Sequence, residues 1–285
     1  MSTKNLSIIS PYAYRTPPKD INFHYIINEV KYVEDLLSNN KLAYDDNVPA
    51  TINLLARYYR NYKDLPKKEC EDLIYKHLVN TIGDISASRC INRVNRACSN
   101  RRYNGNHGYK AIRDFDGINI TLNELNALKA LKSLEEQELL FTVLCFTKMY
   151  DETNRRQGRK VNHLFYVDVS VLRRCAGWKK GTKEQAEEML RDFYNRGLLG
   201  LIENRDKYAE LTGQTRQPMF TRQCLIVDDD SDPVLFVDNF DTLGLTWRYL
   251  LGEKVKKCEC GRYFEVKSNR QKRCAKCALE KRKKR

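Results

Sequence analysis

The sequence predicts a mainly α-helical protein with a small β component. Three observations support this fold class. Apolar residues recur at helical spacing through most of the first 130 residues, short strand-like runs lie between residues 163 and 228, and two close pairs of cysteines lie near the C-terminus. We therefore expect an N-terminal helical region, a central region of helices and strands, and a small cysteine-based unit.

The composition is that of a folded protein without a membrane span. The chain has 285 residues, 41% hydrophobic and 31% charged, which allows about two domains. Its first residues lack the apolar segment of a secretory signal, and the longest apolar stretch, in residues 139–146, is far shorter than the roughly 20 residues of a spanning helix. We expect a cytoplasmic protein whose ten cysteines are reduced, so each is a metal ligand or a small core residue.

The N-terminal region is expected to be helical after a flexible leader. Residues 1–20 contain three prolines and no periodic pattern, and residues 21–132 form a helical domain in our division of the chain. Four helices are expected there: one that ends at Ser38, two that begin at Pro49 and Pro66, and one that runs from Ile85 to Ser99. His77 falls on the apolar stripe of the third helix, which favours a core position over a metal-binding one.

Positive charge is concentrated in two blocks. Residues 81–113 carry seven Lys or Arg against one Asp, and residues 258–285 carry eleven against three Glu, in a chain of formal charge +14. This concentration is typical of proteins that bind the nucleic-acid backbone.

The first basic block combines a predicted helix and a loop. The helix should bury Ala87, Ile91, Val94 and Cys98 on one face and present an arginine stripe on another, and the loop after it interleaves basic and aromatic residues up to Arg113. The predicted phosphate contacts are Arg89, Arg93, Arg96, Arg101 and Arg102. The alternative is a merely solvated face.

Residues 121–228 form a succession of capped helices and short strands. Thr121 with Glu124 and Ser133 with Glu136 have capping-box spacing, so two helices begin there, the second buried in its middle and running to about Tyr150. The further elements are a strand from His163, a short helix capped by Asp168 or Ser170, a turn at GWKKGT, a helix at 182–196 capped by Thr182, and strands at 198–203 and 220–228 around a loop at 204–219. Asp228 to Asp230 are interpreted as a solvated turn, because no second carboxylate cluster accompanies them.

This order of elements resembles the winged helix-turn-helix family over residues 133–228, and we assign a winged-helix domain to residues 133–241. The resemblance implies that helix 182–196 enters the major groove and that loop 204–219 contacts the backbone or minor groove. The helix, however, carries four carboxylates against three cations, which disfavours contact with phosphates. The better candidates for nucleic-acid contact around it are Arg155, Arg156, Lys179, Lys180, Arg205, Lys207 and Arg216. The alternative is a winged helix that binds another protein through the acidic helix 182–196.

The C-terminal cysteines have the spacing of a metal site. Cys258-x-Cys260 and Cys274-x-x-Cys277 are two short pairs that can converge on one tetrahedral ion, and Gly261 permits the tight turn of a zinc knuckle. We predict one structural Zn²⁺ per chain in a knuckle or ribbon at residues 242–280, followed by a basic tail at 281–285; four free thiols are the alternative. Basic residues around it, Arg270, Lys272 and Arg273, are further candidates for nucleic-acid contact. The six other cysteines are predicted to lie in the core.

The run CGRYFEVKSNRQKRCAKC and the helices of LLARYYRNYKDLPKKECEDLIYKHL resemble a group of phage and mobile-element proteins of Gram-positive bacteria, over about residues 50–280. The resemblance implies a DNA-associated setting and carries over no catalytic residue. Sequence motifs of common enzymes are absent, so we expect no enzyme. The leading hypothesis is a regulator or accessory factor that binds nucleic acid, DNA in preference to RNA. The alternative is an inhibitor or adaptor that binds a protein.

Overall fold

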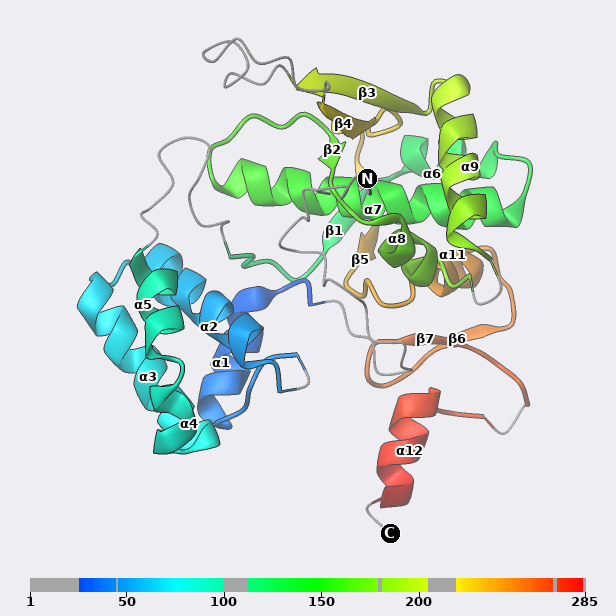
Figure 1. Cartoon of the computed structure of the whole chain (residues 1–285). Helices are drawn as coiled ribbons and strands as arrows, with labels where there is room; N and C mark the ends of the chain where they lie inside the picture. The colour runs from blue at the N-terminus through cyan, green and yellow to red at the C-terminus, as the bar shows by residue number, and fades with distance from the viewer. Residues whose placement is uncertain are drawn as a thin grey trace, which may run out of the picture. The chain divides into compact units, whose positions relative to one another are not determined.

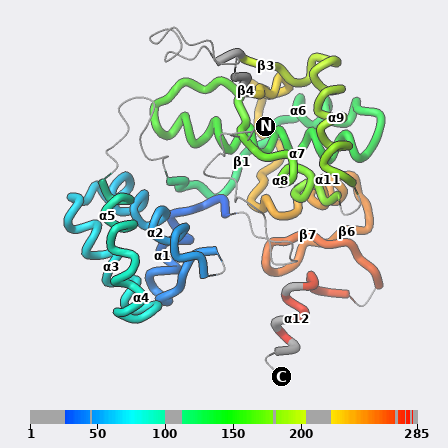
Figure 2. The backbone as a smooth tube through the Cα atoms, in the orientation of Figure 1, coloured from blue at the N-terminus to red at the C-terminus, as the bar shows by residue number. Residues whose placement is uncertain are grey.

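The computed structural model describes residues 26–44, 46–99, 112–178, 181–204, 219–268 and 271–283. They divide into two compact units, residues 26–116 and the described residues from 117 onwards (Figure 1; Figure 2). The described chain is mainly helical, with three small antiparallel sheets. In these ranges no helix combines the length and the apolar character that crossing a membrane requires.

The first unit is built from helices. They are α1 (Glu29–Ser38), α2 (Val48–Arg57), the π-helix η1 (Tyr58–Tyr62), α3 (Lys67–Ile82), α4 (Asp84–Ser88) and α5 (Ile91–Ser99). The side chains of Asn28 and Asn47 cap α1 and α2 by accepting hydrogen bonds from the backbone N–H groups of Lys31 and Ala50. Pro66 precedes α3, as the sequence predicted.

The helix expected over residues 85–99 is two helices, which corrects the prediction. The hydroxyl of Ser88 donates to the carbonyl of Ile85, and the N–H of Cys90 donates to Ala87, so a tight turn replaces the helical bonds there. The turn changes which face of α5 is buried. Ile91 is 44% exposed, whereas Ala97 joins Val94 in the core.

The core of the first unit contains the histidine and two of the cysteines that the sequence assigned to it. His77 is buried and its Nε2 lies 3.0 Å from the carbonyl oxygen of Lys41, which accepts its hydrogen bond. Burial lowers the pKa of His77. The Sγ atoms of Cys70 on α3 and Cys98 on α5 lie 3.1 Å apart, both fully buried.

The two ends of the first unit are joined by a buried ion pair. The backbone N–H of Arg113 donates to Glu29 Oε2 over 3.0 Å, and Arg113 Nη2 lies 3.4 Å from Glu29 Oε1. Arg113 also donates to the carbonyls of Ile26 and Ile27. The segment that enters this unit is therefore bonded to the segment that leaves it.

The second unit contains the remaining elements. They are β1 (Ile118–Thr121), α6 (Leu122–Lys129), α7 (Leu134–Arg156), β2 (Leu164–Phe165), α8 (Val169–Cys175), α9 (Lys183–Asn195), β3 (Leu199–Asn204), β4 (Met219–Cys224), β5 (Pro233–Val237), α11 (Leu243–Leu250), β6 (Val255–Lys257), β7 (Tyr263–Glu265) and α12 (Ala275–Lys283).

The capping residues of this unit are those that the sequence identified. Thr121 and Thr182 form full capping boxes with Glu124 and Gln185, and the side chain of Ser133 accepts from the N–H of Glu136. Helix α7 is buried through its middle as predicted and continues to Arg156, beyond the expected end at Tyr150.

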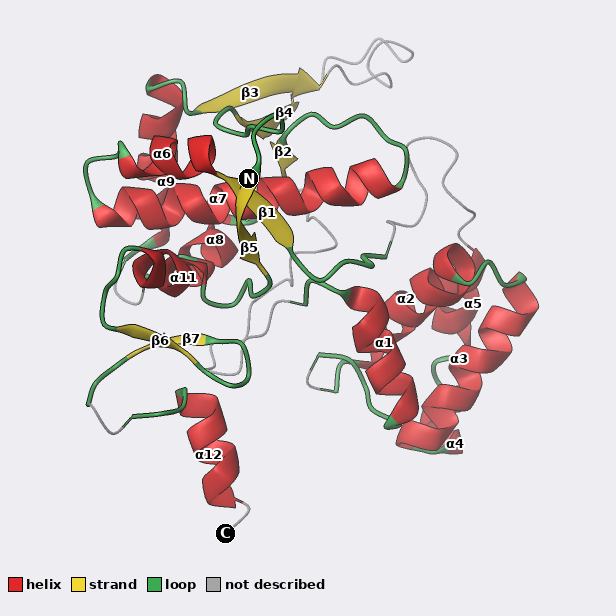
Figure 3. Ribbon diagram, turned by 180° about the vertical axis from the view of Figure 1, so that it is seen from behind, coloured by secondary structure: helices red, strands yellow, loops and turns green. Residues whose placement is uncertain are grey.

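Helix α7 lies between a sheet and two helices (Figure 3). The sheet has the order β2-β4-β3, all antiparallel, with Leu199 opposite Cys224 and Leu164 opposite Gln223. The strand expected from His163 is short, because it pairs with β4 at two residues only, Leu164 and Phe165. A separate ladder joins β1 to β5, with Ile118 opposite Val237.

Helices α8 and α11 pack on the other side of α7. The rings of Phe141 on α7 and Trp247 on α11 lie 5.3 Å apart between centroids. A side chain at Gly244 would collide with the backbone carbonyl of Ala176, so glycine lets α11 approach the end of α8.

Candidate metal centre and candidate nucleic-acid interface

The four C-terminal cysteines come from two local structures. Cys258 and Cys260 lie in the turn between β6 and β7, where Gly261 has a φ of +83° and its N–H donates to the carbonyl of Cys258 over 2.9 Å. Cys274 immediately precedes α12 and Cys277 lies in its first turn. A knuckle and the start of a helix thus face one another.

The sulfur atoms form a cluster that could bind a metal ion. All four Sγ atoms lie within 4.8 Å of one another, and those of Cys260 and Cys274 are 3.6 Å apart. Four thiolates around a tetrahedral ion at ~2.3 Å would be separated by ~3.8 Å, so the donor set fits such an ion. Within the described ranges this is the one such group of His, Cys, Asp or Glu side chains. The predicted convergence of the four cysteines is confirmed.

Backbone N–H groups point at the cluster. The N–H of Cys274 lies 3.4 Å from Cys258 Sγ. Burial raises the pKa of Cys258, but the N–H groups of Cys274 and Cys260 outweigh it and lower this pKa to about 7. A large fraction of Cys258 is therefore already thiolate, the form that binds metal, near neutral pH.

The cysteine module, residues 255–283, is held to the rest of the second unit by polar contacts. Arg262 Nη2 lies 2.9 Å from Asp241 Oδ2, and both side chains are buried. The N–H of Tyr263 donates to Thr242 Oγ1 over 3.3 Å. The module's own apolar cluster consists of Cys258, Phe264 and Cys274 with Val266 and Cys277, too few to hold a fold without metal or support.

The arginines predicted on residues 85–99 are presented to solvent. Arg89 lies in the turn between α4 and α5, and Arg93 and Arg96 lie on α5. All three are exposed, and none makes an ion pair with an acidic side chain in the described part of the chain. Arg101 and Arg102 lie outside the described residues. Arg113, the last cation of this basic block, is buried against Glu29 and is not available to a ligand.

Two of the residues predicted to contact nucleic acid around the central sheet, Arg155 and Arg156, are described by the structure, and both make ion pairs with acidic side chains of the same unit. Arg155 lies 2.9 Å from Glu152 and 3.4 Å from Asp229, and Arg156 lies 2.6 Å from Glu152. Lys179, Lys180, Arg205, Lys207, Arg216 and Arg270 lie outside the described residues. Near the cysteines, Lys272 is exposed and Arg273 lies 3.5 Å from Glu259.

Helix α9 presents an acidic face. Ala186, Leu190 and Phe193 are buried, while Glu184, Glu188 and Asp192 are exposed. Its cations are mostly paired, because Lys183 lies 3.4 Å from Glu187 and Arg196 lies 2.9 Å from Asp192. The carboxylates remain the dominant charge of this surface.

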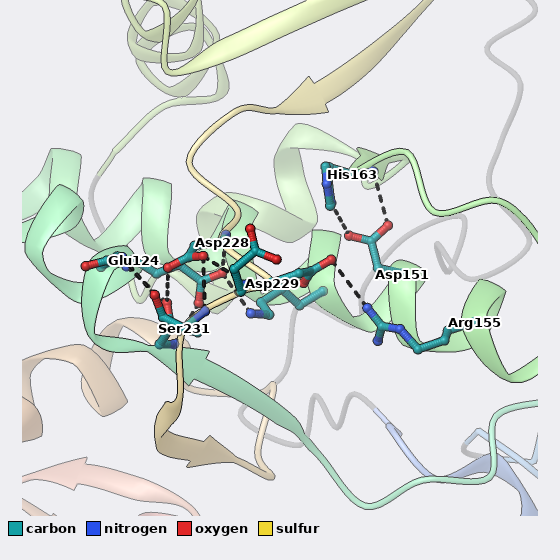
Figure 4. Close-up of polar contacts among 11 residues, drawn as sticks. Glu124, Asp151, Arg155, His163, Asp228, Asp229 and Ser231 are labelled. Carbon is teal, nitrogen blue, oxygen red and sulfur yellow. Dashed lines mark hydrogen bonds and ion pairs between the residues drawn. The ribbon is translucent and has the colours of Figure 1, made fainter.

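The aspartates at 228–230 belong to a polar network that sequence reasoning missed (Figure 4). Glu124 is fully buried, bonded to Lys148 at 2.7 Å, and accepts from the N–H of Asp228. Hydrogen bonds from Ser231 and from the N–H of Asp230 lower the pKa of Asp228 to about 2. The carboxylates therefore bind the turn to α6 and α7, and the capping-box residue Glu124 was the one sequence signal of this network.

His163, which immediately precedes β2, forms a hydrogen-bonded pair with a carboxylate of α7. Its Nδ1 lies 2.9 Å from Oδ2 of Asp151, a carboxylate that is almost fully buried on α7 (Figure 4). The pair anchors the start of the short strand β2 to the helix.

Comparison of the chain with protein-family models, with curated proteins and with solved structures finds no match.

Proposed function

We propose that this chain is a nucleic-acid-binding protein with a preference for DNA, acting as a regulator or accessory factor of a phage or mobile element in the cytoplasm. The observation that carries the proposal is the exposed group Arg89, Arg93 and Arg96. A surface with three cations and no neighbouring carboxylate in its own sequence segment attracts phosphates and releases their counterions. No acidic residue occurs in the sequence between Asp84 and Asp114.

The region from α7 to β4 supports a winged helix-turn-helix as part of this proposal. The order α7, β2, α8, α9, β3, β4 and the sheet order β2-β4-β3 are those expected for the family. The acidic face of α9 argues against its insertion beside phosphates. Backbone contacts from this domain are assigned instead to Arg205, Lys207 and Arg216 and to Lys179 and Lys180.

The metal of the cysteine centre is proposed to be a single structural Zn²⁺. Four thiolates are the donor set of structural zinc sites, and a closed tetrahedral shell leaves no position for a reacting water. The metal would stabilise a module with little apolar core and so fix the basic residues around it.

The proposal is tested by fluorescence anisotropy of the purified full chain with labelled 30-base-pair DNA, the matching RNA duplex and the single strands, at two salt concentrations. We expect binding to duplex DNA that weakens steeply as salt rises. Absence of duplex binding at low salt would contradict the proposal.

The alternative of a protein-interaction module rests on α9. An exposed acidic helix face suits a basic protein partner. Glu184→Gln with Glu188→Gln should leave DNA binding equal or tighter under the proposed function, because it removes like charge from near the phosphates. Weakened capture of a host protein by the same variant, with no duplex binding by the unmodified chain, would favour the alternative.

A further inference from the structure

The solvent face of α5 carries asparagines as well as the arginines of the stripe. Val94, Ala97 and Cys98 are buried, and α5 packs by this side against α2 and α3. The opposite face consists of exposed residues that are cationic or neutral hydrogen-bonding groups, apart from Ile91: Asn92, Arg93, Asn95, Arg96 and Ser99.

The sequence Asn-Arg occurs twice on this face, at residues 92–93 and 95–96. Residues three apart lie on the same side of an α-helix, so the two pairs are neighbours. Three residues advance a helix by about 4.5 Å, so the two pairs lie within the length of two base-pair steps of ~3.4 Å each.

Both residue types suit base edges. In the major groove, arginine donates two hydrogen bonds to O6 and N7 of guanine, and asparagine bonds to N6 and N7 of adenine. A groove ~12 Å wide admits one helix. The deep, narrow major groove of duplex RNA does not, which selects DNA as the ligand.

We propose that α5 is the helix that enters the major groove of DNA, and that Asn92, Arg93, Asn95 and Arg96 read base edges there. The inference rests on the proposed function and deepens it by assigning sequence recognition to the first unit rather than to α9. Arg89, in the turn before α5, is placed to contact the adjacent phosphate.

The packing of α5 supports a rigid reading surface. Its buried side is fixed by Val94 and Cys98 in the core. Glu71 on α3 is a carboxylate close to Cys98, and it lies 3.5 Å from Lys67, which offsets its negative charge. The exposed side of α5 therefore keeps its positive charge. Helix α9 offers the opposite chemistry, with carboxylates that would repel the phosphates flanking a groove.

The test begins with a pool of randomised DNA duplexes selected for binding to the full chain. Affinities for the enriched duplex and for its scrambled version are then compared. Asn92→Ala with Asn95→Ala should reduce the ratio of these affinities by about 5- to 150-fold for each base edge that is no longer recognised, and leave the affinity for scrambled DNA and its salt dependence unchanged. Asn119→Ala, an exposed asparagine on β1, is the matched control and should change neither value.

A second measurement does not depend on variants. Methylation of guanine N7 with dimethyl sulfate blocks the major-groove acceptor without altering the phosphates. Methylated guanines within the enriched site should abolish binding by the unmodified chain. Binding that tolerates this methylation would overturn the assignment of α5.

The outcomes separate the two proposals. A chain that binds no duplex at low salt contradicts the proposed function and this inference together. A chain that binds duplexes but enriches no sequence, or whose double asparagine variant keeps full preference, contradicts the inference and leaves the proposed function standing.

Discussion

Arg248 on α11 connects the buried carboxylate of Glu138 on α7 to Glu265 on β7. Its Nε donates to Glu138 Oε1, and its Nη1 donates to Glu265 Oε1 over 3.1 Å. The second oxygen of Glu138 accepts from the indole N–H of Trp178 over 3.2 Å. Arg248 thus joins the cysteine module to α7, and Glu138 in turn joins α7 to the turn before α9.

Replacement of Arg248 by methionine should destabilise the second unit. The side chain of Glu138 is 1% exposed, so the variant would leave a buried carboxylate without its cation, at a cost of about 3 kcal/mol. Denaturant unfolding measures the effect. Lys257→Met is the control, because its pair with Asp238 is 44% exposed on both sides and should contribute at most about 1 kcal/mol. Equal losses of stability in the two variants would contradict this account.

The cysteine centre should hold about one zinc ion per chain, measured by mass spectrometry of the metal in purified protein. Cys274→Ser with Cys277→Ser removes both ligands contributed by α12 and its N-terminal flank, so the zinc content should fall to near zero. Cys90→Ser, in the first unit, should keep it. Full zinc content in the double variant would show that the metal lies elsewhere.

The arginines at 89, 93 and 96 should dominate the salt dependence of DNA binding. In the proposed complex Arg89 contacts a phosphate, and Arg93 and Arg96 bring two further cations into the groove between the phosphates. Replacing all three with alanine should therefore flatten the slope of log K against log salt by about 0.7 to 0.9 for each phosphate charge that is no longer neutralised. Lys31→Ala with Lys68→Ala is a control in the same unit, because these exposed lysines pair with Asp116 and Asp72. An unchanged slope in the triple variant, or an equal change in the control, would mean that the arginines are only solvated.

Acid should weaken the buried ion pair between Glu29 and Arg113, which joins the two ends of the first unit. Burial alone would raise the pKa of Glu29, but Arg113 and Arg57 outweigh it and hold this pKa below its usual 4.5. A lowered folded-state pKa stabilises the fold at pH values above the unfolded pKa, and this contribution disappears as pH falls through the folded pKa.

Thermal unfolding followed by circular dichroism checks this expectation. The midpoint temperature of wild-type unfolding should fall as the pH is lowered below about 4.5. Glu29→Gln should be less stable at neutral pH, and its midpoint temperature should depend less on acid. Parallel pH curves for the two proteins would exclude Glu29 as the titrating group.

Local signals in the sequence identified several features correctly. Thr121, Ser133 and Thr182 cap helices because a cap and its partner lie within one turn of chain. The four metal-binding candidates were also found, since each pair is short and its spacing restricts its geometry. Five of the six other cysteines are fully buried, and Cys90 is partly so.

Long-range partners were not visible in the sequence. Arg113 counted as a surface cation in the charge pattern, because its partner Glu29 lies 84 positions away. The pairing of β1 with β5 and the contact of Glu138 with Arg248 join segments that are still farther apart in the sequence. The break before α5 depends on the hydroxyl of Ser88, which competes with a helical hydrogen bond, and apolar periodicity does not record such competition.

The pairing of Glu29 with Arg113 has a genetic consequence. A unit whose two ends lie close together can be inserted into a host protein, and it can also be removed and replaced by a short connection. The coding sequence for residues 26–116 is therefore suited to transfer as a cassette.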